Sequence, residues 1–510
     1  MKVPIIDPFL NKITMYRLTL YYLISLVGAA FILSFLKILP YNPLDLLVSA
    51  LVTSATSLFF NFLFSKFFKA TTNIESVFIT ALILTLIIPV KSPANLAFLM
   101  LASFTAMGSK YLVTIEKIHI FNPAAVSVAA IALLSPEHTA TWWIGTAPML
   151  PFVILGGLLL LRKIEREDMV FNFILTYLLL IAIPPFVRDT NISSILNSFS
   201  TAVFRSPLFF FSFVMLTEPL TSPSKASRRT IYASIVALLY ATPQLRLFGF
   251  AFTPEMSLCI GNIYSYIVNP KYKLFLKLKE KIKVSPDTYL FNFGKIQNFN
   301  FFPGQYVEWT LPHKNTDSRG NRRYFSIASA PEDDLEIAVK FYPNSSSFKK
   351  ALFNLDPQKQ IIASSLSGDF VLPKKEAMPI VFIAGGVGIA PFASIIKNAI
   401  NRGKRLNIAV LFANKRREDI IFEDLLEAAR QYGVNTIYTL TDVDSIPQDW
   451  EGERGRITAS MIQKSIPDYE SRLFYISGPA PMVKAYQEIL RQLNIDNKDI
   501  IVDYFPGYEE

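Results

Sequence analysis

Hydrophobic positions divide the chain into two halves of different character. From about residue 16 to residue 268 one apolar run follows another, and several of these runs contain no charged residue. From residue 269 onward Lys, Arg, Asp and Glu return, and apolar residues alternate with polar ones over short segments. Long apolar runs are typical of membrane helices, whereas short alternating segments are typical of strands in a water-soluble domain. The pattern therefore predicts a boundary near residue 270.

The apolar runs of the first half predict a polytopic α-helical membrane domain of about ten spans. Several runs are shorter than the roughly 20 residues that cross a bilayer, which indicates broken or half-length helices. With the N-terminus inside, most Lys and Arg of the loops fall on the cytoplasmic side, where the second half also emerges. We therefore expect an inner-membrane protein with cytoplasmic soluble domains. The predicted spans are residues 16–38, 43–65, 75–90, 94–112, 121–135, 142–161, 169–187, 207–219, 229–247 and 252–268.

Two proline motifs recur in the first half at nearly constant spacing. IPVKSP, which ends at Pro93, matches EPLTSP, which ends at Pro223, 130 residues later (223 − 93). FNP at 121–123 similarly matches FTP at 252–254. An odd number of predicted spans separates the copies, so the two halves of the domain should have opposite topology. Inverted repeats with interrupted helices commonly meet around a polar ligand near the membrane midplane.

The second half shows two successive patterns. Short alternating segments between residues 272 and 372 predict a small antiparallel β-barrel. From residue 379 onward strands alternate with helices, which predicts a doubly wound parallel α/β sheet. The chain should therefore contain three domains: a membrane domain at 1–270, a barrel at 271–373 and a nucleotide-binding domain at 374–510.

Cysteine and histidine are scarce, which excludes several kinds of redox centre. Cys259 is the only cysteine, so the chain can form no internal disulfide and cannot supply the roughly four thiolates of an iron–sulfur cluster. Only His119 and His138 lie in the first half, too few for a pair of trans-membrane haems. We expect no metal site. The net charge of +10 is explained by basic loops, and no basic–aromatic motif indicates nucleic acid.

Two short strings in the second half carry the chemistry. RRYFSIAS at 322–329 places a cation, two aromatic rings and a hydroxyl on one predicted strand. A flavin needs such a set: a cation for its pyrophosphate, a ring against the isoalloxazine and a hydroxyl near the redox nitrogen. FIAGGVGIAPF at 382–392 is a glycine-rich turn between a strand and a helix, which lets the backbone approach a dinucleotide pyrophosphate. Together the strings predict hydride transfer between a pyridine nucleotide and a flavin.

A barrel followed by a nucleotide fold with these motifs closely resembles the ferredoxin–NADP reductase superfamily, over about residues 272–510. The resemblance implies FAD and NAD(P)H as cofactors. It implies that Arg323 binds the FAD pyrophosphate, that Tyr324 or Phe325 packs on the flavin, and that Ser326 sits near N5. Ser477 stands where many relatives have Cys and would face the nicotinamide, so the predicted catalytic residues are Ser326 and Ser477.

The same resemblance extends to further cofactor-binding positions. AVKFY, SSSFKKAL and SGDFVLP resemble a second flavin-contacting stretch, GPAPMV resembles a second nucleotide segment, and DYFPGY resembles a C-terminal aromatic cover of the flavin. Lys415, Arg416 and Arg417 either bind a 2′-phosphate or form a solvated loop, which leaves NADH and NADPH both open. The additional predicted residues are Val339, Lys340, Ser346, Ser347, Gly368, Asp369, Phe370, Gly385, Gly386, Gly388, Pro391, Gly478, Pro479, Met482 and Phe505.

HIFNPAA at 119–125 and MLTEPLTSP at 215–223 resemble the membrane D subunit of Rnf complexes and the B subunit of sodium-translocating NADH:quinone reductases. Those subunits carry flavin, but the D-G-x-[ST]-G-A-T-like motif for covalent FMN is missing here. A second, non-covalent flavin or a quinone is left open. Glu218 and Asn122 form the candidate membrane site. Glu218 either binds a ligand or coupling cation, or faces cytoplasmic water.

The sequence thus predicts a membrane-bound NAD(P)H oxidoreductase that passes a hydride to FAD and electrons onward to a flavin or quinone in the membrane domain. The expected partners are the lipid bilayer, NAD(P)H and an electron acceptor that is a flavin, a quinone or a small redox protein. The alternative is a flavin or ion transporter with a fused reductase domain. A haem-containing ferric reductase or NADPH oxidase would share the second half but needs histidine pairs that the first half lacks.

Overall fold

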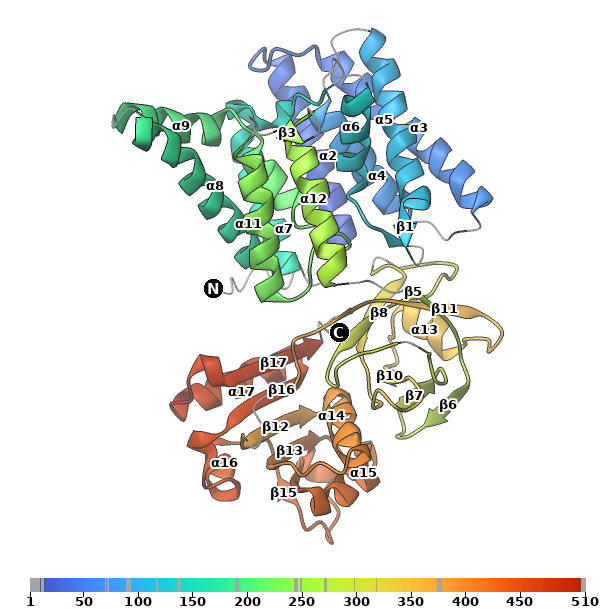
Figure 1. Cartoon of the computed structure of the whole chain (residues 1–510). Helices are drawn as coiled ribbons and strands as arrows, with labels where there is room; N and C mark the ends of the chain where they lie inside the picture. The colour runs from blue at the N-terminus through green and yellow to red at the C-terminus, as the bar shows by residue number, and fades with distance from the viewer. Residues whose placement is uncertain are drawn as a thin grey trace. The chain divides into compact units, whose positions relative to one another are not determined.

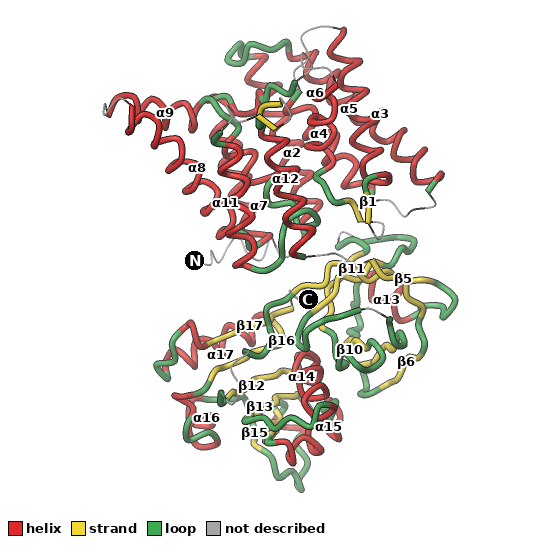
Figure 2. Tube along the Cα trace, in the orientation of Figure 1, coloured by secondary structure: helices red, strands yellow, loops and turns green. Residues whose placement is uncertain are grey.

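The structure, a computed structural model, divides into two compact units, Met1–Tyr272 and Lys273–Glu510. It describes residue 10 and residues 13–68, 70, 73–88, 93–115, 118–134, 139–188, 192–242, 246–247, 250–269, 273–297, 299–317, 319–373 and 378–505. Pro89 and His138, which the sequence analysis singled out, lie outside the described residues. Figure 1 shows the chain coloured from its N-terminus, and Figure 2 shows that strands are concentrated in the second unit.

Apolar helices build the first unit, and polar residues mark where several of them begin. The Thr14 side chain accepts a hydrogen bond from the Arg17 amide at the start of α2, and Asn42 caps α3 in the same way. Each of the ten predicted apolar runs contains a helix. The helices are α2 (Met15–Phe35), α3 (Pro43–Phe67), α4 (Ile74–Ile87), α5 (Pro93–Leu112), α6 (Pro123–Leu134), α7 (Leu150–Ile164), α8 (Glu167–Arg188), α9 (Ile192–Phe204), α10 (Leu208–Phe210), the π-helical η3 (Phe211–Met215), α11 (Ala226–Tyr240) and α12 (Pro254–Val268).

The predicted number of about ten spans is wrong by the criteria of helix length and composition. Within the described residues, three helical segments are long and apolar enough to cross a membrane: α2, α3 and Ala147–Ile164. The pair α9 and α10–η3, bent by 58°, would make a fourth if it is one broken span. The 14 residues of α4 reach only about 21 Å at 1.5 Å per residue, less than a bilayer core of about 30 Å. The apolar runs alone therefore predicted too many membrane spans.

The first unit repeats one arrangement of elements. A two-stranded hairpin, β1 (Thr114–Ile115) with β2 (Ile118–His119), precedes α6, and a second hairpin, β3 (Arg246–Leu247) with β4 (Phe250–Ala251), precedes α12. Both α6 and α12 begin at a proline, Pro123 and Pro254, 131 residues apart (254 − 123). Helix α3 packs against α5 in the first copy as α8 packs against α11 in the second (Figure 1). The repeated proline motifs thus coincide with repeated structure.

The FAD-side domain of the second unit consists of two antiparallel sheets rather than one closed barrel. One sheet has the order β10-β7-β6 and the other β5-β11-β8-β9; among the described residues, a single bridge between Ile327 and Ile337 joins them. The alternating segment at 273–284 divides at 278–279, so β5 pairs in one sheet and β6 in the other. The elements are β5 (Lys273–Lys277), β6 (Glu280–Lys283), β7 (Thr288–Asn292), β8 (Tyr306–Thr310), β9 (Arg322–Ser326), β10 (Glu336–Lys340), α13 (Ser347–Phe353) and β11 (Gln360–Ser367).

The rest of the second unit is a doubly wound parallel sheet, as the alternating pattern predicts. Six strands lie in the order β15-β14-β13-β12-β16-β17, with α14 and α15 packed on one face and α16 and α17 on the other. The strand order runs from β12 to β15 on one side of β12 and continues with β16 and β17 on the other side. Ligands of such sheets bind at this reversal, between β12 and β16. The elements are β12 (Ile380–Gly385), α14 (Ala390–Asn401), β13 (Ile408–Asn414), α15 (Glu423–Ala428), β14 (Val434–Leu440), β15 (Glu453–Arg454), α16 (Ala459–Ser465), β16 (Leu473–Pro479), α17 (Ala480–Gln492) and β17 (Ile500–Phe505).

Candidate functional site

Strand β9 presents its predicted flavin residues on two faces. Arg323 and Phe325 point toward α13, since both contact the ring of Phe348, at 5.4 Å and 6.1 Å. Tyr324 points the other way, where its ring is 52% exposed and stands edge-on to Tyr306 at 5.5 Å. Because side chains alternate along a strand, Ser326 shares the face of Tyr324. Of the two predicted aromatic residues, Tyr324 therefore has the ring surface open to a flat ligand, and Phe325 packs inward.

Arg323 and the start of α13 lie close to each other, as a pyrophosphate site requires. Ser346 caps α13 by accepting a hydrogen bond from the Lys349 amide, and the Ser347 amide donates to Asp317 at 2.8 Å. The same Asp317 carboxylate is 3.9 Å from the Arg323 guanidinium. Its pKa is lowered because hydrogen bonds from the Ser347 amide and from Arg319 outweigh the opposing effect of burial. The carboxylate of Asp317 thus occupies the position where a phosphate group would be expected.

The other predicted FAD-binding residues differ in their exposure and in their contacts. Gly368, with φ of +114°, lies against Tyr306, and Asp369 is exposed. Lys340 pairs with Asp287 at 3.0 Å. Val339 and Phe370 are 1% and 4% exposed and pack in the hydrophobic core, so a contact with a flavin would come from their main chain.

The glycine-rich turn after β12 has the geometry that a dinucleotide pyrophosphate needs. Gly386 has φ of +52°, which side-chain-bearing residues rarely adopt. A Cβ on Gly388 would lie 2.4 Å from the carbonyl oxygen of Ser477, so only glycine allows the turn to approach the end of β16 so closely here. The turn leads directly into α14, in which Pro391 occupies the first turn. Backbone amides at the start of a helix favour an anion.

The predicted second nucleotide segment meets this turn. Met482 at the start of α17 lies against both Gly385 and Gly478, and Pro479 also approaches Gly385. Ser477, on β16, is fully buried, and its hydroxyl has no hydrogen-bond partner among the described residues. A buried hydroxyl without a partner costs free energy, so it is a natural contact for a ligand group.

One residue of the site escaped the sequence analysis. Asp503 on β17 pairs in register with Ser477 on β16, and its carboxylate accepts a hydrogen bond from the Ser326 hydroxyl at 3.3 Å. Burial raises the pKa of Asp503 to about 6, and the hydrogen bond from Ser326 only partly opposes this rise. Asp503 therefore bonds one predicted catalytic serine, Ser326, and lies in register with the other, Ser477. The sequence signal was weak, because 177 residues separate Asp503 from Ser326. The side chain of Phe505 lies outside the described part of the chain.

In the first unit, Glu218 and Asn122 are in direct contact. The Asn122 amide donates to the Glu218 carboxylate at 2.9 Å, and the Thr221 hydroxyl donates to the same oxygen at 3.0 Å. The other Glu218 oxygen is 3.7 Å from Nε2 of His119. Asn262 of α12 joins the group by accepting from the Asn122 backbone amide at 2.9 Å. His119 and Asn262 were not predicted as site residues, since their neighbours lie up to 140 residues away.

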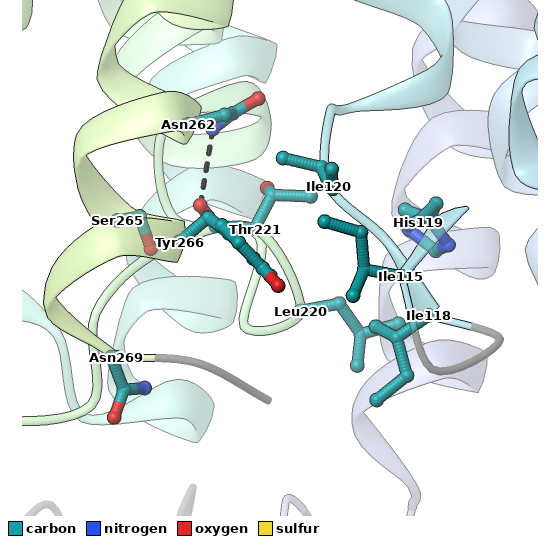
Figure 3. A pocket seen from close by; sticks show the side chains of 10 residues that line it. All are labelled: Ile115, Ile118, His119, Ile120, Leu220, Thr221, Asn262, Ser265, Tyr266 and Asn269. Atoms are coloured by element: carbon teal, nitrogen blue, oxygen red, sulfur yellow. Dashed lines mark hydrogen bonds between the residues drawn. The ribbon is translucent and has the colours of Figure 1, made fainter. Parts of the chain in front are cut away.

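Two cavities flank this polar group. One, of about 60 Å³, is lined by Asn122 and Glu218 together with Ser76 and Thr80. Figure 3 shows the other, of about 10 Å³, where Asn262 hydrogen-bonds Thr221. These volumes hold water molecules, whereas a drug-sized ligand needs roughly 300 Å³ or more. A flavin or quinone ring would enter only if side chains moved. Among the described residues, no group of three or more His, Cys, Asp or Glu could hold a metal ion.

Comparisons with known proteins bear on the second half. Residues 275–371 match the oxidoreductase FAD-binding domain, and residues 382–488 match the oxidoreductase NAD-binding domain. The second half therefore contains FAD-binding and NAD-binding oxidoreductase domains of the ferredoxin–NADP reductase superfamily. Its cofactors are accordingly FAD and NAD(P)H. These matches do not test the resemblance of the first half to Rnf and sodium-translocating reductase subunits, which stays a prediction.

The second half is similar to several individual proteins. The reductase subunit of stachydrine N-demethylase from Rhizobium meliloti is 28% identical over 221 residues, which are 42% of this chain and 61% of the relative. NADH-cytochrome b5 reductase 1 from Ajellomyces capsulatus is 28% identical over 46% of this chain and 79% of its own. The solved cytochrome b5 reductase domain of Ulva prolifera nitrate reductase, 25% identical, covers 45% of this chain and 97% of that domain with a TM-score of 0.41. The chain thus spans about three fifths of the length of the first relative.

Proposed function

We propose that this protein is a membrane-anchored NAD(P)H oxidoreductase with a membrane domain at 1–270, an FAD domain at 271–373 and a nucleotide domain at 374–510. NAD(P)H gives a hydride to FAD, and electrons then pass to a flavin or quinone held by the membrane domain. The observation that carries the proposal is the contact of Ser326 with Asp503, which is in register with Ser477. The flavin motif and the nucleotide motif therefore converge on one point of a single compact unit.

The residues present fit FAD and NAD(P)H. The exposed ring of Tyr324 offers a surface for the isoalloxazine, and Arg323 with the amides of α13 offers positive charge to the pyrophosphate. The Gly386–Gly388 turn offers backbone amides to the dinucleotide, and the Ser477 hydroxyl offers a hydrogen bond to the nicotinamide. When bound, FAD supplies the chemistry of accepting a hydride and releasing electrons singly.

Ser326 and Asp503 would control a proton at this point. The Ser326 hydroxyl donates its single proton to Asp503 while that carboxylate is ionised, and it is able to donate to a ligand atom once Asp503 is protonated, near pH 6. Below that pH the Asp503 carboxyl is neutral and adds no negative charge beside the flavin. Above that pH its charge opposes the arrival of a hydride. The pair therefore sets both the position of the hydroxyl and the electrostatics of the site.

The membrane half would provide the electron carrier and the anchor. Three apolar helices of sufficient length support an anchor, and the resemblance to Rnf and sodium-translocating reductase subunits supports a flavin or quinone as carrier. The Glu218–Asn122 group is the candidate site, with the adjoining cavity enlarging when the carrier enters. A relative that serves as the reductase subunit of a demethylase supports the general plan of an acceptor separate from the FAD domain.

Anaerobic titration of the purified full chain tests this function. Bound FAD should bleach at 450 nm on addition of NADH or NADPH, and reoxidation should follow addition of a quinone or of free flavin. A second, non-FAD flavin in stoichiometric amount would identify the membrane carrier as a flavin. A protein that holds no FAD, or whose FAD is reduced by neither nucleotide, would contradict the proposal.

A further inference from the structure

The end of β13 lies where the adenosine end of the nucleotide would be bound. Gly385 of the nucleotide turn pairs with Ala413 of β13, so Asn414 is the next residue on the neighbouring strand. In the proposed function the nicotinamide lies beside Ser477 on β16, on the opposite side of β12. The adenosine ribose should therefore extend over Asn414 and the residues that follow it.

The two arginines of this segment are already paired with carboxylates. Arg416 donates from Nε to Asp442 at 3.2 Å and lies 3.8 Å from Glu418. Arg417 donates to Glu423 at 2.6 Å, and its guanidinium stacks on the ring of Trp450 at 5.5 Å. Each arginine is therefore held in a defined position by a group of opposite charge.

Carboxylates outnumber cations around this position. Segments 414–424 and 441–445 contain three basic and six acidic residues, a net charge of −3 (3 − 6). A phosphate monoester carries about −1.5 to −2 at pH 7, so a 2′-phosphate placed here would meet mostly like charge. Screening acts over about 8 Å at physiological salt, so charges within that distance of the phosphate would still act on it. The residues counted are Lys415, Arg416, Arg417, Glu418, Asp419, Glu423, Asp424, Asp442 and Asp444.

Asn414 adds an independent observation. Its side chain is 4% exposed, and neither its amide nitrogen nor its amide oxygen has a hydrogen-bond partner among the described residues. An amide can both donate to and accept from a hydroxyl, whereas its oxygen would oppose a phosphate, which offers only acceptors at full ionisation. The unpartnered amide thus suits the 2′- and 3′-hydroxyls of an unphosphorylated ribose.

We propose that the nucleotide site selects NADH and rejects NADPH, with Asp442 and Glu423 as the specificity-determining residues because they hold Arg416 and Arg417 away from a 2′-phosphate. This inference rests on the proposed function and narrows its NAD(P)H substrate to NADH.

The test compares NADH with NADPH in the full chain, with a soluble dye as acceptor. The value of kcat/KM for NADH should exceed that for NADPH by about 30-fold or more, the combined effect expected of several partly exposed charges. ADP-ribose should likewise inhibit much more strongly than its 2′-phosphate in the unmodified protein.

Variants then examine the carboxylates themselves. The double substitution Asp442→Asn with Glu423→Gln should raise kcat/KM for NADPH by about 5-fold and leave that for NADH nearly unchanged, since each exposed pair contributes modestly. Asp468→Asn is the matched control, because Asp468 pairs with Arg472 at 2.8 Å just before the first residue of β16, at the end of the strands away from the nucleotide turn. Asp468→Asn should leave the ratio of kcat/KM for NADH to kcat/KM for NADPH unchanged.

Two results would overturn the inference while leaving the proposed function intact: NADPH used as well as NADH, or a double variant with normal FAD content and an unchanged nucleotide ratio. If the double variant loses FAD, inhibition of the unmodified protein by ADP-ribose and by its 2′-phosphate tests the inference instead. Equal inhibition by the two compounds contradicts it. Failure of both nucleotides to reduce the flavin would overturn the proposed function, and the inference with it.

Discussion

Two carboxylates, Asp503 in the second unit and Glu218 in the first, each belong to a candidate site and have different surroundings. Asp503 is partly buried and accepts from the neutral hydroxyl of Ser326, and burial raises its pKa to about 6. Glu218 accepts hydrogen bonds from Asn122 and Thr221. It also lies 3.7 Å from His119.

The difference separates two uses of a carboxylate. A carboxyl group whose ionised form is poorly supported exchanges a proton near neutral pH, which suits a site where a hydride arrives. A carboxylate supported by several donors keeps its charge and fixes the residues around it. Within the proposed function, Asp503 would control a proton beside the flavin, and Glu218 would belong to a fixed site for the electron acceptor.

The largest expected effect concerns Ser326. Ser326→Ala should keep most FAD but slow flavin reduction about 10- to 100-fold, because a hydrogen bond that strengthens in the transition state is worth roughly 1–3 kcal/mol. Stopped-flow absorbance at 450 nm measures the rate. Reduction at the normal rate would contradict a role of the Ser326–Asp503 pair in flavin reduction, and with it the contrast drawn with Glu218.

Arg323→Ala provides the complementary variant. It should weaken FAD binding by about 10-fold or more, since a charge-assisted contact with the pyrophosphate is lost, while the FAD that remains bound is reduced at a nearly normal rate. FAD content after dialysis and the same stopped-flow trace distinguish affinity from rate. Full FAD retention would show that Arg323 does not hold the pyrophosphate.

Neutralising the two carboxylates by substitution should change the free energy of unfolding in opposite directions. The raised pKa of Asp503 means that its ionisation opposes folding, a cost that is fully present above about pH 6 and absent below its unfolded pKa of about 4. Asp503→Asn should therefore stabilise the protein by about 1–2 kcal/mol at pH 7 and have little effect at pH 4. Glu218→Gln should destabilise it, because an amide cannot accept from all the donors around Glu218.

The midpoint for release of fluorescent FAD on heating reports the effect of Asp503→Asn, and a tryptophan or tyrosine signal reports that of Glu218→Gln. Shifts of the same sign in both variants would remove the distinction between the two carboxylates.

A smaller effect should appear in the pH dependence of flavin reduction. The rate in the unmodified protein should rise about 3-fold as pH falls through about 6, because protonation removes the negative charge of Asp503 beside the site. Asp503→Asn should show no step in this range. A step that persists in the variant must belong to another group.

The sequence predicted those parts of the site that depend on local patterns. The β9 motif and the glycine turn lie on a strand and at a strand–helix junction, as their residues indicate. Alternation along β9 leaves Tyr324 exposed and turns Phe325 inward, which favours Tyr324 in a choice that the sequence left open. Asp503 was missed because its partner is 177 residues away and its segment was interpreted through its aromatic residues.

Contacts between distant segments also explain the errors in the first half. Glu218 and Asn122 were predicted to belong to one site, but Asn262 joins them only because α12 packs on α6, and His119 joins through its contact with Glu218. The span count was too high because a buried helix and a membrane helix have the same apolar composition, and only length separates them. Helix α4 illustrates this, with nine buried residues among its 14.

The division of labour between the two units is tested most directly by two activities measured in one membrane preparation: reduction of a soluble dye by NADH, and reduction of a quinone by NADH. Ser326→Ala should lower both activities equally, since every electron enters through the flavin. Glu218→Gln should lower only the quinone activity and leave the dye activity unchanged. If Glu218→Gln lowers both activities equally, or neither, electrons do not pass from the FAD domain through the Glu218 site.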